Sequence, residues 1–362
     1  MRIRCTSAVV AALVLVLALP AAACAGVAPR GAKATTTGIS SATCARNRAA
    51  GVMTFVSPFS FDASAGIIDV FAADSLGYFK AQCISVRFVT NSETATALVS
   101  SGAGTISGEG SAADDLQQVA AGLHLTAIAT YGNTSDYALL TSKNITSLKQ
   151  LDGKVVAYHV LLPAILHEML LRAGVKYSSL HLVNDTTYNP TLVTSGVYQG
   201  LQAYQTNEPL TLREAHLTFH EFIPATYKIS GTFNVEVVNT TFLRDHPSAV
   251  AGFLRAELHA FAYCAAHEAR CVDLEAARAR SAGLTPNVTH MLAEWQLEVR
   301  LAEDHHLAGE GIGVQSIAEW QPEVHLLTSL HVLSTVPALS GVEDTSLAAS
   351  LYRGSTLVWP GS

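Results

Sequence analysis

Short apolar runs alternate with helical patterns over the first half of the chain. Apolar runs that predict strands lie at 52–56, 84–89, 105–107 and 125–130. Apolar residues at helical spacing fill the intervals 63–76, 93–101 and 112–121, and Gly77, Gly102 and Gly122 follow them. A glycine just past a helical pattern favours a C-terminal cap. This alternation is typical of an α/β protein with a mostly parallel sheet.

A second series of the same kind starts near residue 140. It has apolar runs at 155–158, 180–183, 201–204 and 217–222, with helical patterns at 164–173 and 190–199. The run at 235–239 returns to the first series, and Pro247 opens a long amphipathic helix. We therefore expect a discontinuous first lobe over 51–139 plus 238–362, with a helical C-terminal part, and a second lobe over 140–237. Hinges are expected near 137–142 and 235–240.

The N-terminus has the pattern of a secretory signal peptide. Arg2 and Arg4 precede an apolar run at 8–19, which is too short to span a bilayer, and three alanines stand before Cys24. The pattern predicts a signal peptide over 1–23. Cys24 resembles the lipidated cysteine of bacterial lipoproteins, and ordinary signal-peptidase cleavage is the alternative. Residues 24–50 are small and polar and predict a flexible tether, so the expected place is the outer face of the cell membrane.

Four further cysteines follow the predicted signal peptide and Cys24. An even number in an oxidising compartment suggests two disulfides. Of the three possible pairings we favour Cys44 with Cys83 and Cys264 with Cys271. The spacings match no zinc motif, so no metal site is expected.

Composition narrows the class of protein. Of 362 residues, 49% are hydrophobic and 14% are charged, and the formal charge is −7. This apolar content argues against a disordered chain. No basic run longer than a dipeptide occurs, so nucleic acid is not an expected partner. Loss of residues 1–23 would remove two arginines and no acid, and would change the charge to −9.

Candidate ligand-binding residues stand where predicted strands end, because ligands of open α/β sheets bind there. In chain order they are Phe59, Phe61, Asp62, Glu109, Ser111, Tyr131, Tyr158, Asn207 and Glu208. Purely structural roles remain open as alternatives. The two phenylalanines could fill the core of the lobe, Ser111 could cap a helix, and the tyrosines could pack against the protein without contacting a ligand.

Glu208 is the strongest of these candidates. Pro209 favours an extended backbone at Glu208, and a carboxylate there can accept two hydrogen bonds from an aminopyrimidine edge. The alternatives are a helix N-cap or a surface charge. The only lysine and arginine between residues 51 and 140 are Lys80 and Arg87. Because an anion would favour arginine, lysine or free helix N-termini, we expect a neutral or cationic nitrogen heterocycle.

Five stretches, in order, resemble one family. They are Gly77-Tyr78-Phe79-Lys80, residues 101–106, residues 151–156, Asn207-Glu208-Pro209, and residues 242–256. Together they are similar to the thiamine-precursor group of ABC-transporter substrate-binding proteins, which also includes riboflavin, nitrate, taurine and aliphatic-sulfonate binders. The resemblance implies a type 2 periplasmic-binding-protein fold with two mostly parallel lobes and two hinge strands. It also implies a monomer that clamps a small molecule, docks on an ABC permease and needs no cofactor.

Other functions stay open beside this expectation. A receptor for nitrate, taurine or aliphatic sulfonates, a sensor, and a secreted enzyme on the same fold are the alternatives. No G-x-S-x-G turn, H-E-x-x-H motif or cysteine-rich iron motif occurs, so no catalytic residue is expected. Gln202 stands where the family usually has aspartate, and all three tryptophans fall in the C-terminal third.

Overall fold

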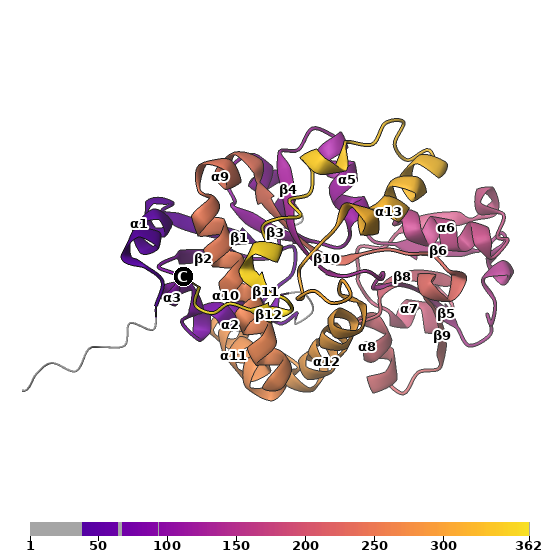
Figure 1. The fold of residues 1–362 in the computed structure, drawn as a ribbon. Helices are drawn as coiled ribbons and strands as arrows, with labels where there is room; N and C mark the ends of the chain where they lie inside the picture. Colours follow the sequence, from indigo (N-terminus) through magenta and orange to yellow (C-terminus); the bar gives the residue numbers. More distant parts are fainter. Residues whose placement is uncertain (1–37, 64–66, 93, 362) are drawn as a thin grey trace, which may run out of the picture. The chain divides into compact units, whose positions relative to one another are not determined.

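The computed structural model describes residues 38–63, 67–92 and 94–361 (Figure 1). The predicted signal peptide over 1–23 and the predicted lipidation site Cys24 lie outside the described residues. Within the described part, no helix is long and apolar enough to cross a membrane.

The first sheet has five strands in the order β2-β1-β3-β10-β4. These are β1 (Val52–Val56), β2 (Ser85–Val89), β3 (Ile106–Glu109), β4 (Leu125–Gly132) and β10 (Phe233–Asn239). β1 runs parallel to β2 and β3, whereas β10 is antiparallel to both β3 and β4. Only β10 therefore runs against the others.

The second sheet repeats this arrangement in the order β7-β6-β8-β5-β9. Its strands are β5 (Tyr137–Ser142), β6 (Val155–Tyr158), β7 (His181–Asn184), β8 (Gly200–Tyr204) and β9 (Phe219–Phe222). β6 is parallel to β7 and β8, and β5 is antiparallel to β8 and β9. The predicted fold class, α/β with mostly parallel sheets, is confirmed.

Helices cover the sheets and dominate the C-terminal third. They are α1 (Ser41–Ala49), α2 (Ile68–Ser75), α3 (Tyr78–Ala81), α4 (Ala95–Ser100), α5 (Ala112–Ala120), α6 (Ala164–Arg172), α7 (Thr191–Thr194), α8 (Glu208–Glu214), α9 (Thr240–Asp245), α10 (Pro247–Ala266), α11 (Glu268–Ser281), α12 (Val288–His305) and α13 (Ile317–Ser329). A two-stranded ribbon of β11 (Tyr352–Arg353) and β12 (Thr356–Leu357) follows. The helix predicted over 190–199 is shorter than expected, since only α7 forms there.

Aromatic packing holds α2 and α10 on one face of the first sheet. The ring of Phe55 on β1 stacks on Phe253 of α10 with centroids 6.2 Å apart, and it meets Phe71 of α2 edge-on at 6.4 Å. All three rings are buried. On the other face, α5 and α13 contribute Leu116 and Trp320 to a second apolar cluster.

Two helices of the C-terminal third also lie against helices of the second sheet. α12 contacts α8, and α13 contacts α6 (Figure 1). The chain itself crosses from β4 to β5 over 133–136 and returns from β9 to β10 over 223–232. The sequence predicts hinges near 137–142 and 235–240, but these ranges form strands β5 and β10. The connections between the two sheets lie just before these strands.

The start of the described chain differs from the flexible tether expected over 24–50. Residues 41–49 form helix α1, whose first turn is capped by the Ser40 side chain, which accepts a hydrogen bond from the Thr43 N–H at 3.1 Å. A disulfide joins Cys44 to Cys83. The side chain of Asn47 is buried and donates to the Gln82 carbonyl at 2.8 Å. These contacts fix the segment on the first sheet's helices.

The second disulfide joins Cys264, near the end of α10, to Cys271 in α11. Both pairings are those that the sequence favoured. All four cysteines in the described part of the chain are therefore oxidised.

Candidate functional site

Aromatic contacts connect the carboxyl end of β1 with the second sheet. The ring of Phe59, in the loop after β1, stands edge-on to the ring of Tyr204 at the end of β8, with centroids 6.5 Å apart. Tyr204 stacks on Tyr137, the first residue of β5, at 5.0 Å. Ligands of open α/β sheets bind beyond the carboxyl ends of strands. Phe59 and Tyr204 lie at such ends, and Tyr137 lies beside Tyr204 because β5 runs antiparallel to β8.

Asp114 brings a carboxylate from the first sheet's side to these rings. The hydroxyl of Tyr137 donates a hydrogen bond to Oδ2 of Asp114 at 3.2 Å, and the hydroxyl of Ser111 donates to the same oxygen at 2.8 Å. Ser111 also caps α5, since its side chain accepts from the Asp114 N–H. Burial raises the pKa of Asp114, and these hydroxyl donors oppose the shift.

Gly110 makes the approach of Tyr137 possible. A Cβ atom at this position would lie 2.9 Å from the Tyr137 hydroxyl oxygen and 3.0 Å from Oδ2 of Asp114. Both distances are shorter than van der Waals contact. The absence of a side chain in the turn after β3 is therefore a steric condition for the hydrogen bond between Tyr137 and Asp114.

Glu208 reaches the same place from the second sheet. It is the first residue of α8, and its Oε2 accepts a hydrogen bond from the backbone N–H of Tyr204 at 2.8 Å. Only 6% of the residue is exposed. Burial raises the pKa of Glu208 to about 7, and the nearby Glu294 adds to the shift. The extended backbone expected at Glu208 is wrong, because the residue begins a helix with Pro209 in its first turn.

Asp136 lies near both of these carboxyl groups. Burial raises the pKa of its carboxyl to about 8, and the negative charges of Asp114 and Glu208 contribute. Its Oδ1 is buried and has no hydrogen-bond partner among the described residues. We call Phe59, Asp114, Asp136, Tyr137, Tyr204 and Glu208 the tyrosine–carboxylate cluster.

Helix α12 borders the cluster and joins it to α8. Nε2 of His290 lies 3.1 Å from Oδ1 of Asn207, the residue before α8, and Nδ1 lies 3.0 Å from Oε1 of Glu214. The carboxyl of Glu294, 3.4 Å from Nε2, is the main cause that raises the pKa of His290 to about 9. His290 is therefore protonated at neutral pH, and both ring nitrogens donate.

The cluster lies among further acidic side chains. Glu298, also on α12, is hydrogen-bonded to the Asn234 amide at 3.3 Å, and burial raises the pKa of its carboxyl, with Asp136 contributing. Among the described residues, none of the carboxyl groups of the cluster forms an ion pair with lysine or arginine. A ligand that donates hydrogen bonds or carries positive charge would favour the ionised form of these carboxyl groups. Ionised carboxylates accept hydrogen bonds, so the arrangement suits such a ligand.

The aromatic residues add a second kind of recognition. The faces of tyrosine and phenylalanine attract cations and stack on flat rings. A buried carboxylate beside such faces can bind an N–H group by a charge-assisted hydrogen bond worth about 1.5–3 kcal/mol. The cluster can therefore hold a flat molecule with N–H donors at its edge. No group of three or more histidine, cysteine or acidic side chains in the described residues has a geometry that would bind a metal ion.

Tyr131 lies away from this cluster, inside the first sheet's core. Its hydroxyl is fully buried and hydrogen-bonds to Oδ2 of Asp69 at 2.9 Å and Oε1 of Glu257 at 3.0 Å. Glu236 of β10 completes this group of acids, and burial raises the pKa of its carboxyl to about 8. The sequence suggests Tyr131 as a candidate ligand-binding residue. Its buried hydroxyl and ring do not leave it free to stack on a ligand.

The remaining candidates are also placed by their contacts. Phe61 packs on Phe71 with ring centroids 5.0 Å apart, and Asp62 accepts a hydrogen bond from Ser60. Tyr158 lies near Tyr177 on the α6 side of the second sheet and raises the pKa of its hydroxyl. These three residues are not brought to the cluster.

Glu109 lies at the border of the cluster. Its Oε2 accepts from the Gln118 amide at 2.9 Å, and burial together with Asp114 raises the pKa of its carboxyl. Glu109 is therefore a further acid near Asp114, and its own hydrogen bond stays within the first sheet's side.

Sequence reasoning missed Asp114, Asp136, Tyr137, Tyr204 and the acids of α12. One signal was available: His290, Glu294 and Glu298 recur every four residues beside the buried Trp295 and Val299. This spacing places three ionisable side chains on one helix face, and a buried face of that kind indicates a site rather than a solvated surface.

Comparison with protein families matches residues 64–270 to the NMT1/THI5-like family model. Comparison with curated proteins finds no match.

Solved structures share the fold at low sequence identity. The ligand-binding component of an ABC-type import system from Staphylococcus aureus, with zinc bound, superimposes with a TM-score of 0.61 at 13% identity over 82% of this chain and 97% of that chain. The periplasmic aliphatic sulphonate binding protein SsuA from Escherichia coli gives 0.58 at 14%, over 86% and 95%. The desulfurization enzyme DSZB gives 0.57 at 12%, over 83% and 98%.

Proposed function

The chain belongs to the NMT1/THI5-like family, and from this premise we propose that it is the solute receptor of an ABC importer. The fold that it shares with periplasmic binding proteins supports this function. In this account a small molecule binds between the two sheets and shifts the population from an open to a closed form. The closed form then docks on a membrane permease. No bond in the ligand is made or broken.

One observation carries the proposal. The hydrogen bond from Tyr137 to Asp114 and the contact of Phe59 with Tyr204 bring groups from both sheets to the same buried carboxyls. A ligand held there would touch both halves of the molecule only when they are together. That is the requirement for coupling between binding and closure.

We propose two lobes, expected over 51–139 plus 238–362 and over 140–237, with boundaries that follow the strands, since β5 belongs to the second sheet from Tyr137 on and β10 to the first sheet from Phe233 on. We propose that the connections at 133–136 and 223–232 act as the hinges, since each leads directly into an antiparallel strand of one sheet. Closure would then require backbone rotation at these two short segments while both sheets stay intact.

We favour a small nitrogen heterocycle, of the thiamine-pyrimidine-precursor or riboflavin kind, as ligand. Asp114, Asp136 and Glu208 can accept hydrogen bonds from amino and ring N–H groups, and Tyr137 and Tyr204 offer ring faces. Solved structures of the same fold include the aliphatic sulphonate binding protein SsuA, which supports the alternative of a nitrate, taurine or sulfonate receptor. An anion would meet three acidic side chains without a lysine or arginine partner among the described residues, which argues for the heterocycle.

A secreted enzyme is the second alternative, because DSZB has the same fold. Two features favour a receptor over an enzyme. The four described cysteines are all in disulfides, so none offers a thiolate nucleophile. The histidine nearest the cluster, His290, is held protonated between Asn207, Glu214 and Glu294, which makes it a poor general base at neutral pH.

The place in the cell follows from the sequence pattern. We propose export by the signal peptide over 1–23 and attachment of lipid at Cys24, which would hold a monomeric receptor at the outer face of the membrane beside its permease. The two disulfides support an oxidising compartment.

A ligand panel tests the proposed function. Thermal unfolding of the protein would be followed with a hydroxymethylpyrimidine, riboflavin, taurine, an alkanesulfonate and nitrate. Ligand at about 100 times its Kd stabilises by about 2.7 kcal/mol, which is a shift of several degrees. We expect the shift with a heterocycle, and recovery of that compound unchanged by mass spectrometry. A shift with the anions alone would support the first alternative, and conversion of the bound compound would support an enzyme.

A further inference from the structure

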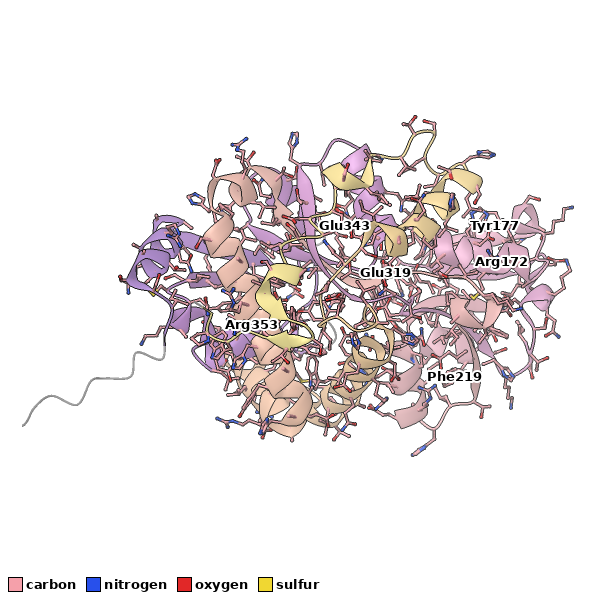
Figure 2. All side chains as sticks on the ribbon, in the orientation of Figure 1. Arg172, Tyr177, Phe219, Glu319, Glu343 and Arg353 are labelled. Atoms are coloured by element: carbon pink, nitrogen blue, oxygen red, sulfur yellow. A yellow bond between two sulfur atoms is a disulfide. The ribbon has the colours of Figure 1, made fainter. Side chains whose placement is uncertain are left out.

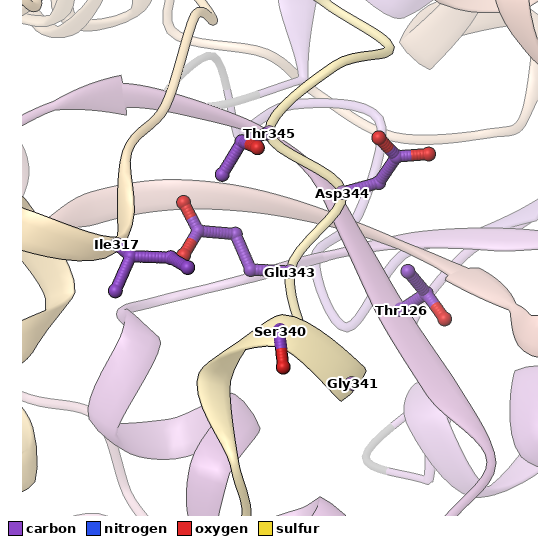
Figure 3. A pocket seen from close by; sticks show the side chains of 7 residues that line it. All are labelled: Thr126, Ile317, Ser340, Gly341, Glu343, Asp344 and Thr345. Atoms are coloured by element: carbon purple, nitrogen blue, oxygen red, sulfur yellow. The ribbon is translucent and has the colours of Figure 1, made fainter.

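A second pocket lies at the other end of the first sheet from the tyrosine–carboxylate cluster. It is a hollow of about 370 Å³ beside Thr126, near the start of β4 (Figure 3). Its lining comes from β4, from the first residue of α13 and from the segment 340–345. Because the cluster lies at the carboxyl ends of the parallel strands and β4 runs the same way as β1 and β3, the two places are separated by the length of the sheet.

The wall of this pocket is a fixed part of the fold. The segment after residue 340 pairs with the edge strand: the Ala127 N–H donates to the Val342 carbonyl at 2.7 Å, and the Asp344 N–H donates to the Ala127 carbonyl at 2.9 Å. The amide of Gln315 bridges the carbonyls of Ala127 and Asp344. The side chain between these two pairing residues, that of Glu343, is therefore held in one position.

Glu343 is a buried carboxyl group without a partner. Only 5% of the residue is exposed, and neither carboxyl oxygen has a hydrogen-bond partner among the described residues. Figure 3 shows its carboxyl extending toward Ile317, whereas Asp344 turns away. The carboxylate of Asp344 is already occupied by Ser346 and by the Leu347 N–H. An unpaired buried carboxylate is costly, so Glu343 calls for a cation or a proton.

We infer that this pocket binds the ammonium group of a small primary alkylamine, with Glu343 as its acceptor. An alkylammonium has three N–H donors, and the Glu343 carboxylate can accept from it. Ser340 and Thr345 also line the pocket, with hydroxyl groups that point away from this carboxyl in Figure 3. The side chain of Ile317, 43% exposed at the pocket wall, offers an apolar surface to the alkyl part. This site is independent of the proposed solute site.

A metal ion fits this pocket less well than an amine. Among the described residues, no group of three or more acidic, histidine or cysteine side chains has the geometry to hold a metal ion. Glu319 on α13 is a further acid near Glu343, and it accepts a hydrogen bond from the Ser316 hydroxyl at 3.0 Å. Both Glu319 and Glu343 are labelled in Figure 2 on the C-terminal part of the chain.

Protonation is the competing explanation, and it gives a pH test. Burial, with a contribution from Glu319, raises the pKa of Glu343 to about 7. The ammonium binds the ionised carboxyl, so amine affinity should be full at pH 8. It should fall by about tenfold for each pH unit well below 7, where a proton must first be displaced. Asp344 also belongs to this segment, and its carboxylate accepts hydrogen bonds from the backbone N–H groups of Ser346 and Leu347.

The experiment is calorimetric titration of the protein at pH 8 with n-butylammonium, and with tetramethylammonium, which has no N–H donor, as the ligand control. We expect saturable binding of butylammonium alone. Glu343→Gln keeps the shape and removes the charge, and it should weaken binding at least tenfold. Ile317→Ala should weaken butylammonium but not methylammonium. Glu208→Gln, in the tyrosine–carboxylate cluster, should leave amine binding unchanged, so a failure of either site is recognised separately.

Absence of saturable amine binding at pH 8 would overturn the inference. Equal affinity for tetramethylammonium would do so as well, as would binding that survives Glu343→Gln. Glu343→Gln could be too unstable to titrate. In that case two other measurements test the inference: the affinities of Ile317→Ala for butylammonium and methylammonium, and the pH dependence of amine binding by the unmodified protein.

Discussion

The hydroxyl of Tyr137 lies 3.2 Å from Oδ2 of Asp114 and connects the strand that enters the second sheet to a helix on the first. The two residues are 23 positions apart, on opposite sides of the connection over 133–136. This bond is therefore well placed to report whether the two halves of the molecule are together.

Removal of that hydroxyl should weaken both folding and ligand binding. Tyr137→Phe leaves the rings stacked and deletes one donor to Asp114. We expect a loss of about 1–2 kcal/mol in the free energy of unfolding, measured with denaturant. Tyr198→Phe is the matched control, since its hydroxyl bonds to Asp185 within the second sheet at 3.4 Å. An equal effect of the two variants would argue against a special role for Tyr137.

Gly110→Ala should break the same contact by crowding. The added methyl group would lie 2.9 Å from the Tyr137 oxygen, so the ring or the turn must move. We expect ligand affinity to fall at least as much as in Tyr137→Phe, as measured by calorimetry. Gly38→Ala, where no atom lies within 4 Å of the new methyl group, should change nothing. Unchanged affinity in Gly110→Ala would mean that the site tolerates displacement of Tyr137.

The ligand-free protein should lose stability as pH rises from about 4 to about 8. Burial raises the pKa of Asp115, Asp136 and Glu236 to about 8 in each case. Between the unfolded and folded pKa values the folded state holds more protons, so each carboxyl costs about 1.4 kcal/mol per pH unit. The stabilising contribution of these carboxyls is complete below their pKa in the unfolded chain, about 4. It is lost as the pH rises from there to their folded pKa of about 8. Glu236→Gln should flatten the curve, which denaturant unfolding at several pH values would measure.

The pKa of His290 should lie far above that of an ordinary histidine, and the protein should lose the stability that protonated His290 contributes as the pH becomes alkaline. Glu294 raises the pKa of His290 to about 9. Its contribution should be complete below the unfolded value near 6.5 and should be lost as pH rises through 9. NMR titration of the ring protons measures this pKa directly, and His290→Gln should reduce the stability lost between pH 8 and pH 10. A midpoint near 6.5 would contradict the contacts with Asn207 and Glu214.

The sequence predicted the sheets well because buried parallel strands form uninterrupted apolar runs. It predicted Phe59 and Glu208 because both follow such runs. It did not predict their partners, since Asp114 and Tyr137 meet only after the chain has crossed between the sheets. The acids of α12 were missed for another reason: in sequence, a buried glutamate such as Glu298 looks like the solvated acid of any helix. Glu208 also showed that Pro209 marks a helix start as readily as an extended residue.

The most direct test of the central claim is the affinity of an aminopyrimidine for three proteins: the unmodified chain, Glu208→Gln, and Glu310→Gln as an exposed control. The account predicts that the compound binds the unmodified chain and the control equally. Glu208→Gln should bind it about 10- to 100-fold more weakly, as expected for loss of one charge-assisted hydrogen bond. Binding of a sulfonate instead, with the same affinity in all three proteins, would contradict the proposed site and its ligand.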